Sequence, residues 1–264
     1  MHPVLFDVGG FSVHAYGALG AIAFLLGAGL TLWRGRRLGM NIERVADVIF
    51  WMSVTGLIGA RLLFVLQNPG ALQHIGQLLD LRSGGLVFYG AFLTGLPTGL
   101  FLLRRAGLPA AAFFDILGTA FPLSHAISRA GCFLAGCCYG LPHDGALAVT
   151  FPPTGVAPPG TPLHPVQLYE ALALLTIAAV TNALYRRPHA RGQVFLLYLV
   201  LYAATRAVVE MFRGDTERGF FLPAVLGEAL TYSQGMSLLV AAVAVALFIR
   251  GARQEPVARG PSTP

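Results

Sequence analysis

The segment HAISRAGCFLAGCCYG concentrates residue types that do chemistry. It holds all three cysteines of the chain, Cys132, Cys137 and Cys138, just after Arg129. His125 precedes Arg129 by four residues, a spacing that places imidazole and guanidinium on one face of a helix. Histidine acts as a general base near neutral pH, and a thiol is a nucleophile or metal ligand that becomes more reactive beside a guanidinium. The segment therefore suits proton transfer or thiol chemistry.

The cysteines allow more than one interpretation. A disulfide from Cys132 to Cys137 or to Cys138 would brace the segment in an oxidising compartment. A thiolate beside Arg129 would instead react as a nucleophile or redox centre. The pattern C-x4-C-C with a neighbouring histidine is not a familiar zinc spacing, so we predict neither a metal nor a cofactor.

A second group of polar residues follows one face of an expected helix. In YAATRAVVEMFRGD, the residues Tyr202, Arg206 and Glu210 are spaced at i, i+4 and i+8. Charges within an apolar span must face the protein interior, so this face predicts a functional cavity, with a structural ion pair as the alternative. The segment LHPVQLYEALAL adds Gln167 and Glu170, which either stabilise a helix N-terminus or line the same cavity.

The composition places these residues in a membrane protein. The chain has 264 residues, of which 55% are hydrophobic and 11% charged, and soluble domains carry roughly 25% charged residues. We predict an all-α integral membrane protein, a single polytopic domain over residues 1–264, with a small extracytoplasmic cap formed mainly by residues 129–165. The seven predicted transmembrane helices cover about 13–33, 45–66, 86–103, 110–128, 166–184, 194–212 and 235–250.

The basic residues set the expected orientation. All 18 are arginines, and most lie in alternate loops between the expected spans. The positive-inside rule then places the N-terminus outside and the C-terminus in the cytoplasm. This distribution accounts for the net charge of +6, so we expect no nucleic-acid partner.

Several motifs, in order along nearly the whole chain, resemble those of the prolipoprotein diacylglyceryl transferase family. They are HAYGALG, SGGLVFYGAFLTG, SRAGCFLAGCCYG, HPVQLYE, YAATRAVVEMFRGD and LTYSQGMSLL. The resemblance implies a transferase of the bacterial cytoplasmic (inner) membrane. Such an enzyme moves a diacylglyceryl group from phosphatidylglycerol to the lipobox cysteine in the signal peptide of a prolipoprotein, forming a thioether and releasing glycerol phosphate.

The resemblance also implies roles for individual residues. Arg129 would contact the lipid phosphate, and Arg206, with Tyr202 and Glu210, would hold the head group or leaving group from the other side. Tyr16 matches an early tyrosine of the family to which a catalytic role is assigned. Two arginines around one phosphate would neutralise the leaving group electrostatically.

The sequence departs from the family pattern at residues that carry polar chemistry. Tyr89 stands where the family has a histidine assigned to thiol activation, and Cys132, Ala135 and Cys137 stand where its signature has two asparagines and a glutamate. We expect His125 to replace the missing base, with Tyr89 as a hydrogen-bond donor.

Two alternatives remain. One is a divergent paralogue that acts on or binds an anionic phospholipid and uses its three cysteines for thiol or redox chemistry. The other is a non-catalytic lipid-binding membrane component.

Overall fold

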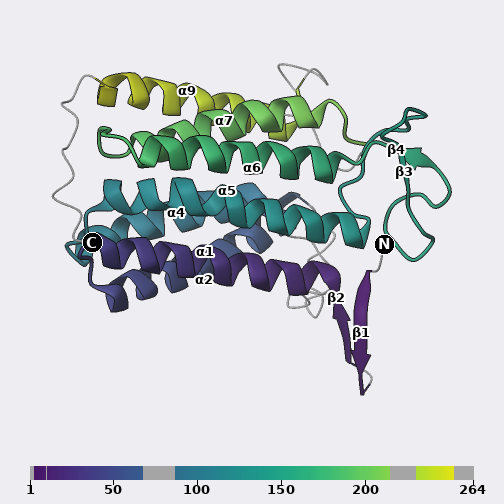
Figure 1. Ribbon diagram of the computed structural model, residues 1–264, viewed down its shortest axis with the longest axis horizontal. Coiled ribbons are helices and arrows are strands. Elements are labelled where there is room, and N and C mark those ends of the chain that lie inside the picture. Colours follow the sequence, from purple (N-terminus) through teal and green to yellow (C-terminus); the bar gives the residue numbers. More distant parts are fainter. Residues whose placement is uncertain (1–2, 10, 68–86, 215–229, 253–264) are drawn as a thin grey trace. The chain divides into compact units, whose positions relative to one another are not determined.

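The computed structural model describes residues 3–9, 11–67, 87–214 and 230–252 (Figure 1). Within these ranges the chain forms seven helices and four short strands. The helices are α1 (Ala15–Arg37), α2 (Ile42–Gln67), α4 (Phe88–Arg105), α5 (Ala110–Ala135), α6 (Val166–Tyr185), α7 (Gln193–Glu210) and α9 (Tyr232–Ala252). The strands are β1 (Val4–Val8), β2 (Phe11–His14), β3 (Val149–Thr150) and β4 (Pro162–Leu163).

The helices have the length and surface of membrane spans. Six of those described are long and apolar enough to cross a bilayer, whereas α4 contains Pro97 and ends in two arginines. Large apolar side chains such as Leu25, Leu172 and Leu239 are exposed on the helix surfaces, as expected for contact with lipid tails. The prediction of an all-α membrane protein is confirmed.

Backbone contacts divide the chain into two compact units. One is residues 32–113, and the other combines residues 1–31 with residues 114–264. The prediction of a single membrane domain stays a prediction.

The unit of residues 32–113 is built on close packing of α2 against α4. Thr94 Oγ1 donates a hydrogen bond of 2.8 Å to the Thr55 carbonyl of the facing helix. A Cβ on Gly90 would collide with the Gly59 backbone, so this approach requires glycine. Small residues bring membrane helices together in this way.

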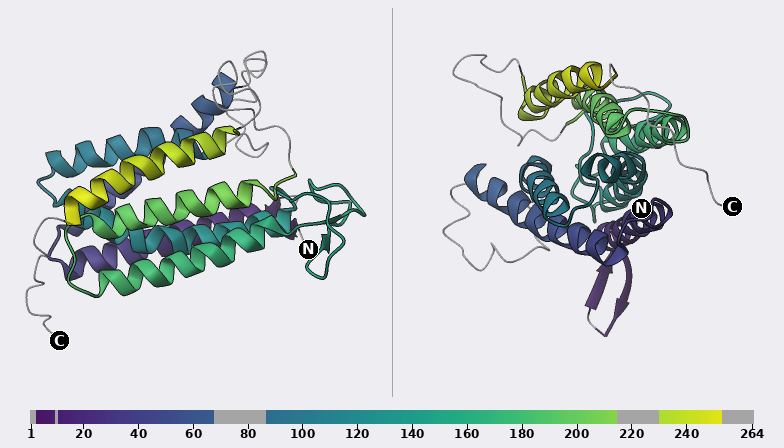
Figure 2. Two further views of the ribbon diagram at one scale, coloured as in Figure 1. Left: turned by 90° about the horizontal axis from the view of Figure 1, so that it is seen from above. Right: turned by 90° about the vertical axis from the view of Figure 1, so that its left-hand side faces the viewer.

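The larger unit contains α5, α6, α7 and α9. Helix α7 packs against α6 and α9, and α6 and α7 run side by side in all the views (Figures 1 and 2). A buried cluster joins Ala126 of α5, Leu174 and Ile177 of α6, and Tyr198 and Tyr202 of α7. These three helices are thereby fixed to one another, and they carry most of the polar residues predicted above.

A buried carboxylate fixes the start of α7. Asp115 accepts hydrogen bonds from the backbone N–H groups of Gly192 at 2.7 Å, Val194 at 2.9 Å and Phe195 at 3.1 Å. Its Oδ2 lies 3.7 Å from His189 Nε2. The first N–H groups of a helix lack intrahelical partners, so a carboxylate there satisfies them and complements the helix dipole.

The predicted end of the fourth span, at residue 128, is wrong. Helix α5 continues to Ala135, so Arg129 and Cys132 lie in the helix and the cap begins after it. Residues 129–135 contain no proline and no strained backbone, and the helix ends where Gly136 takes a positive φ of 72°. An apolar run predicts which part of a helix contacts lipid. The end of the helix is set instead by the backbone conformation of the residue that follows it.

The cap is irregular, as its proline and glycine content predicts. Strands β3 and β4 pair antiparallel, and Phe151, Ala157 and Leu163 form its small core. A second hairpin, β1–β2, precedes α1 and projects from its start (Figure 1). This hairpin was not predicted from the sequence.

Candidate active site

The carboxylate of Glu170, near the start of α6, lies at the centre of a buried polar cluster. Its Oε1 is 3.0 Å from Arg129 Nη2 and accepts a hydrogen bond of 3.3 Å from the Tyr202 hydroxyl. His125 Nε2 lies 4.0 Å from the same oxygen, beyond hydrogen-bond distance. Three helices thus bring imidazole, guanidinium and phenol to one carboxylate whose side chain is 1% exposed.

A second ion pair lies further along α7. Arg206 Nη2 is 2.7 Å from Glu210 Oε2 and donates a hydrogen bond of 3.0 Å to Ser233 Oγ of α9. The i, i+4 and i+8 spacing predicted from the sequence is therefore realised on a face of α7 turned into the protein, where Tyr202, Arg206 and Glu210 are all buried.

Each buried arginine keeps a donor that the described residues do not use. Arg129 Nε and Arg206 Nη1 are buried and have no hydrogen-bond partner within the described part of the chain. A buried donor without an acceptor is costly, by roughly 1–3 kcal/mol, and more when it is charged. The site is thus suited to an anionic group with several acceptor oxygens.

The charges of the site also favour an anion. Arg213, just past α7, acts electrostatically on Glu170 together with Arg129 and Arg206. Among the described residues of the cluster, these three guanidinium groups outnumber the carboxylates, which are Glu170 and Glu210.

The three cysteines form a compact sulfur cluster beside this site. Their sulfur atoms all lie within 4.8 Å of one another, and all three are free thiols. Interaction with the neighbouring Cys132 and Cys137 thiols lowers the pKa of Cys138 well below its usual range. The predicted disulfide stays a prediction.

Most of the predicted site residues come together in the larger unit. They are His125, Arg129, Tyr202, Arg206 and Glu210. The Tyr16 backbone lies against α5, where a Cβ on Gly131 would be 3.4 Å from Tyr16 Cα, and its side chain is 47% exposed. Tyr89 belongs to the other unit, in the first turn of α4.

Two further residues of the site, Glu170 and Ser233, were only weakly indicated by the sequence. The motif HPVQLYE pointed to Glu170, but nothing showed that its carboxylate would be the centre of the cluster. Ser233 lies in the motif LTYSQGMSLL but was not singled out, since a serine at the start of an apolar helix carries no signal of its own.

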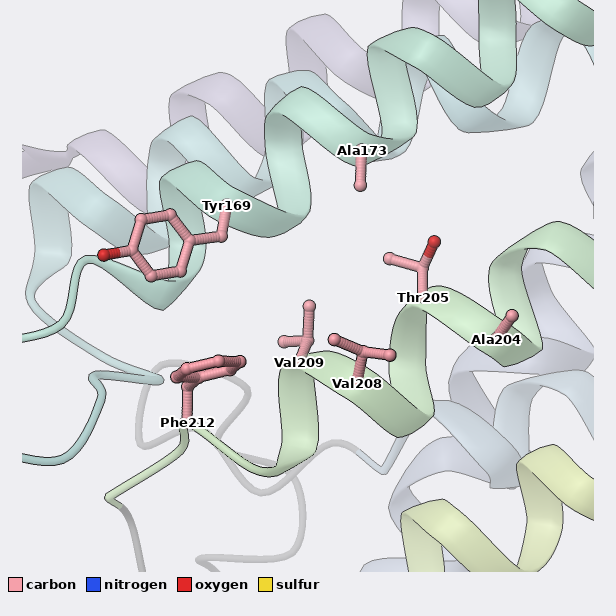
Figure 3. Close-up of a pocket in the computed structure, with 7 residues that line it drawn as sticks. All are labelled: Tyr169, Ala173, Ala204, Thr205, Val208, Val209 and Phe212. Atoms are coloured by element: carbon pink, nitrogen blue, oxygen red, sulfur yellow. The ribbon is translucent and has the colours of Figure 1, made fainter.

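An apolar groove lies on the surface of the same two helices. Its volume is about 460 Å³, and its walls face each other from α6 and α7 (Figure 3). The lining residues are Tyr169, Ala173, Ala204, Thr205, Val208, Val209 and Phe212. Such a surface suits hydrocarbon, and it begins on the helices that carry Glu170 and Arg206.

The known proteins that are similar in sequence to this chain, as reported below, share one name. The family model described as prolipoprotein diacylglyceryl transferase matches residues 3–250. A phosphatidylglycerol–prolipoprotein diacylglyceryl transferase of Clostridium tetani is 28% identical, over 94% of this chain and 97% of its own length. Enzymes of the same name from Symbiobacterium thermophilum and Dehalococcoides mccartyi are 33% and 31% identical, over 81% and 96% of this chain and 82% and 95% of their own lengths. The chain therefore belongs to the prolipoprotein diacylglyceryl transferase family.

Proposed function

We propose that this protein transfers a diacylglyceryl group from phosphatidylglycerol to the lipobox cysteine thiol of prolipoproteins in the bacterial cytoplasmic membrane. Family membership and the names of the relatives support the reaction. The observation that carries it is the pair of arginines at the site, Arg129 and Arg206, each with a buried N–H donor for which no described residue provides an acceptor. The alternate arginine-rich loops support an outside N-terminus and a cytoplasmic C-terminus.

The lipid phosphate binds between the two arginines. Its oxygens accept the remaining donors of Arg129 and Arg206, while Glu170 and Glu210 hold both guanidinium groups in place through their ion pairs of 3.0 and 2.7 Å. As the leaving phosphate gains charge, guanidinium groups fixed in a dry site stabilise it without reorganising.

The reaction is a displacement at carbon. The lipobox sulfur forms a bond to the terminal glycerol carbon of the diacylglyceryl group while the bond from that carbon to the phosphate oxygen breaks. The electron pair leaves with glycerol phosphate. The thiol proton passes to His125, and Glu170 at 4.0 Å from Nε2 stabilises the imidazolium that forms. Tyr202 orients Glu170 through its hydroxyl.

The groove between α6 and α7 holds an acyl chain of the lipid. Its lining is largely aliphatic and aromatic, and Val208 on its wall is exposed toward the surroundings of the helix. A phosphate bound at Arg206 would place the attached chains near α7, the helix that forms one wall of this groove. The groove is therefore expected to contribute to lipid affinity rather than to the chemical step.

The direct test uses purified protein in phosphatidylglycerol vesicles with a synthetic lipobox peptide, scored by the mass added to the peptide. We expect transfer by the wild type and a loss of roughly 100- to 1,000-fold in Arg206→Ala, the range for removing one electrostatic stabiliser. Glu43→Gln, a change at an exposed residue of α2, is the control and should keep full activity.

Two outcomes would refute the assignment. Undiminished transfer by Arg206→Ala would contradict the role of the arginine. Phosphatidylglycerol binding without any transfer by the wild type would favour the non-catalytic alternative.

A further inference from the structure

The three cysteines take no part in the proposed transfer, yet their side chains converge on one point. We propose that Cys132, Cys137 and Cys138 form a binding site for one monovalent copper ion. This site adjoins the transfer site, because Cys132 lies one helical turn after Arg129, and it does not depend on the transfer reaction.

The spacing of the sulfur atoms suits a single ion. All three lie within 4.8 Å of one another. A metal bonded to three thiolates at about 2.3 Å in a trigonal plane holds its sulfur atoms about 4 Å apart. Small side-chain rotations therefore bring the free cluster to the bound geometry, with no change of fold.

The end of α5 builds this arrangement. Gly136, at a φ of 72°, ends the helix with two hydrogen bonds, from Gly136 N to Phe133 O and from Cys137 N to Cys132 O, each 3.2 Å long. This pair is the Schellman pattern, which turns the chain back over the last helical turn. This turn thereby brings Cys137 close to Cys132.

Two further features hold the other thiols in position. Cys138 adopts a φ of 60°, a conformation that residues other than glycine rarely take. The Gln167 side chain of α6 donates a hydrogen bond of 2.7 Å to the Cys137 carbonyl. The cluster thus rests on two packed helices rather than on a free loop.

The donor set favours copper in its monovalent state. Among the described residues, no histidine or carboxylate joins the three sulfur atoms in a candidate metal group. Structural zinc is held by four protein ligands, and calcium and magnesium prefer oxygen. Thiolate-only sites select soft ions such as Cu(I), for which three ligands suffice.

The surroundings allow both access and charge balance. Cys132 is buried, but Cys137 and Cys138 are only partly buried, so an ion reaches the cluster from the side of the cap. Arg129 and Arg213 act electrostatically on Cys138 and offset the negative charge of a thiolate complex. The thiol protons leave to solvent when the metal binds.

The test is a copper titration of the full-length protein in detergent. The protein is reduced, desalted without oxygen and titrated with Cu(I) kept monovalent by ascorbate, in competition with the chromogenic chelator bicinchoninate. We expect one Cu(I) per chain and at least a 100-fold weaker affinity in each of Cys132→Ser, Cys137→Ser and Cys138→Ser. Met211→Leu removes an exposed soft donor outside the cluster, and this variant should bind Cu(I) with the same affinity as the wild type.

Three results would overturn the proposal. One is equal copper uptake by the variant that lacks all three thiols. Another is tighter binding of Zn²⁺ than of Cu(I) in the same competition. The third is unreduced protein that takes up no copper and has a single free thiol per chain. That count would indicate that two of the three cysteines form a disulfide.

Thermal unfolding of each variant separates loss of the site from loss of the fold. If Cys132→Ser unfolds, Cys137→Ser and Cys138→Ser, outside the helix, still decide the question.

Discussion

Replacing Glu170 by glutamine should destabilise the free protein while strengthening its response to anionic lipid. The side chain keeps its size and loses its charge, so Arg129 loses the partner that lies 3.0 Å away. Tyr202 keeps an acceptor, because the glutamine carbonyl replaces the carboxylate oxygen. The main loss is therefore the charge that compensates a buried guanidinium.

The size of the expected loss of stability follows from the burial of the ion pair between Glu170 and Arg129. Glu170 is 1% and Arg129 14% exposed at the side chain, so solvent screens the pair little. Removing one partner of a buried pair costs about 3–5 kcal/mol. In a chain of this size this corresponds to a fall in melting temperature on the order of 10 °C. Phosphatidylglycerol supplies a new counterion, so it should raise the melting temperature of Glu170→Gln more than that of the wild type.

The assay is thermal unfolding in detergent micelles with added phosphatidylglycerol or zwitterionic phosphatidylethanolamine. Glu43→Gln is the matched control, because it makes the same chemical change at an exposed site of α2. A melting temperature for Glu170→Gln equal to that of the wild type without lipid would refute the buried pair. An equal response to both lipids would refute the role of the lipid's net negative charge as the new counterion of Arg129.

Three other outcomes are expected. The pKa of His164 is lowered by desolvation and by the stacked ring of His143, at a centroid distance of 3.8 Å, so its charged form is disfavoured in the fold. Stability should therefore fall as pH drops through about 6.5, and thermal unfolding should show a smaller fall in His164→Gln. Asp115→Ala leaves three N–H groups without their acceptor and should lower the unfolding free energy by roughly 1–3 kcal/mol for each one left unsatisfied, measured by chemical denaturation. Val208→Trp fills the groove, so in the vesicle assay it should slow transfer from long-chain phosphatidylglycerol more than from short-chain lipid.

Local patterns in the sequence predicted the parts of the site that lie on one helix. The spacing of Tyr202, Arg206 and Glu210 fixes their common face by helix geometry alone. Apart from the end of α5, the apolar runs located the ends of the described helices to within about four residues, since lipid contact dictates both composition and length.

Contacts between helices could not be read from the sequence. The central place of Glu170 depends on α5, α6 and α7 packing through residues such as Leu174 and Tyr198, far apart in the chain. Cys132 and Cys137 meet because of the backbone turn at Gly136, whose glycine was visible but whose role depended on where the helix ended.

Complementation of a bacterial strain depleted of its own diacylglyceryl transferase tests the central claim most directly, scored by the lipid mass added to a reporter prolipoprotein. We predict that the wild type restores growth and adds the mass of a diacylglyceryl group, that Arg129→Ala does neither, and that Glu43→Gln does both. Wild-type protein that inserts into the membrane yet leaves the reporter unmodified would contradict the proposed transfer.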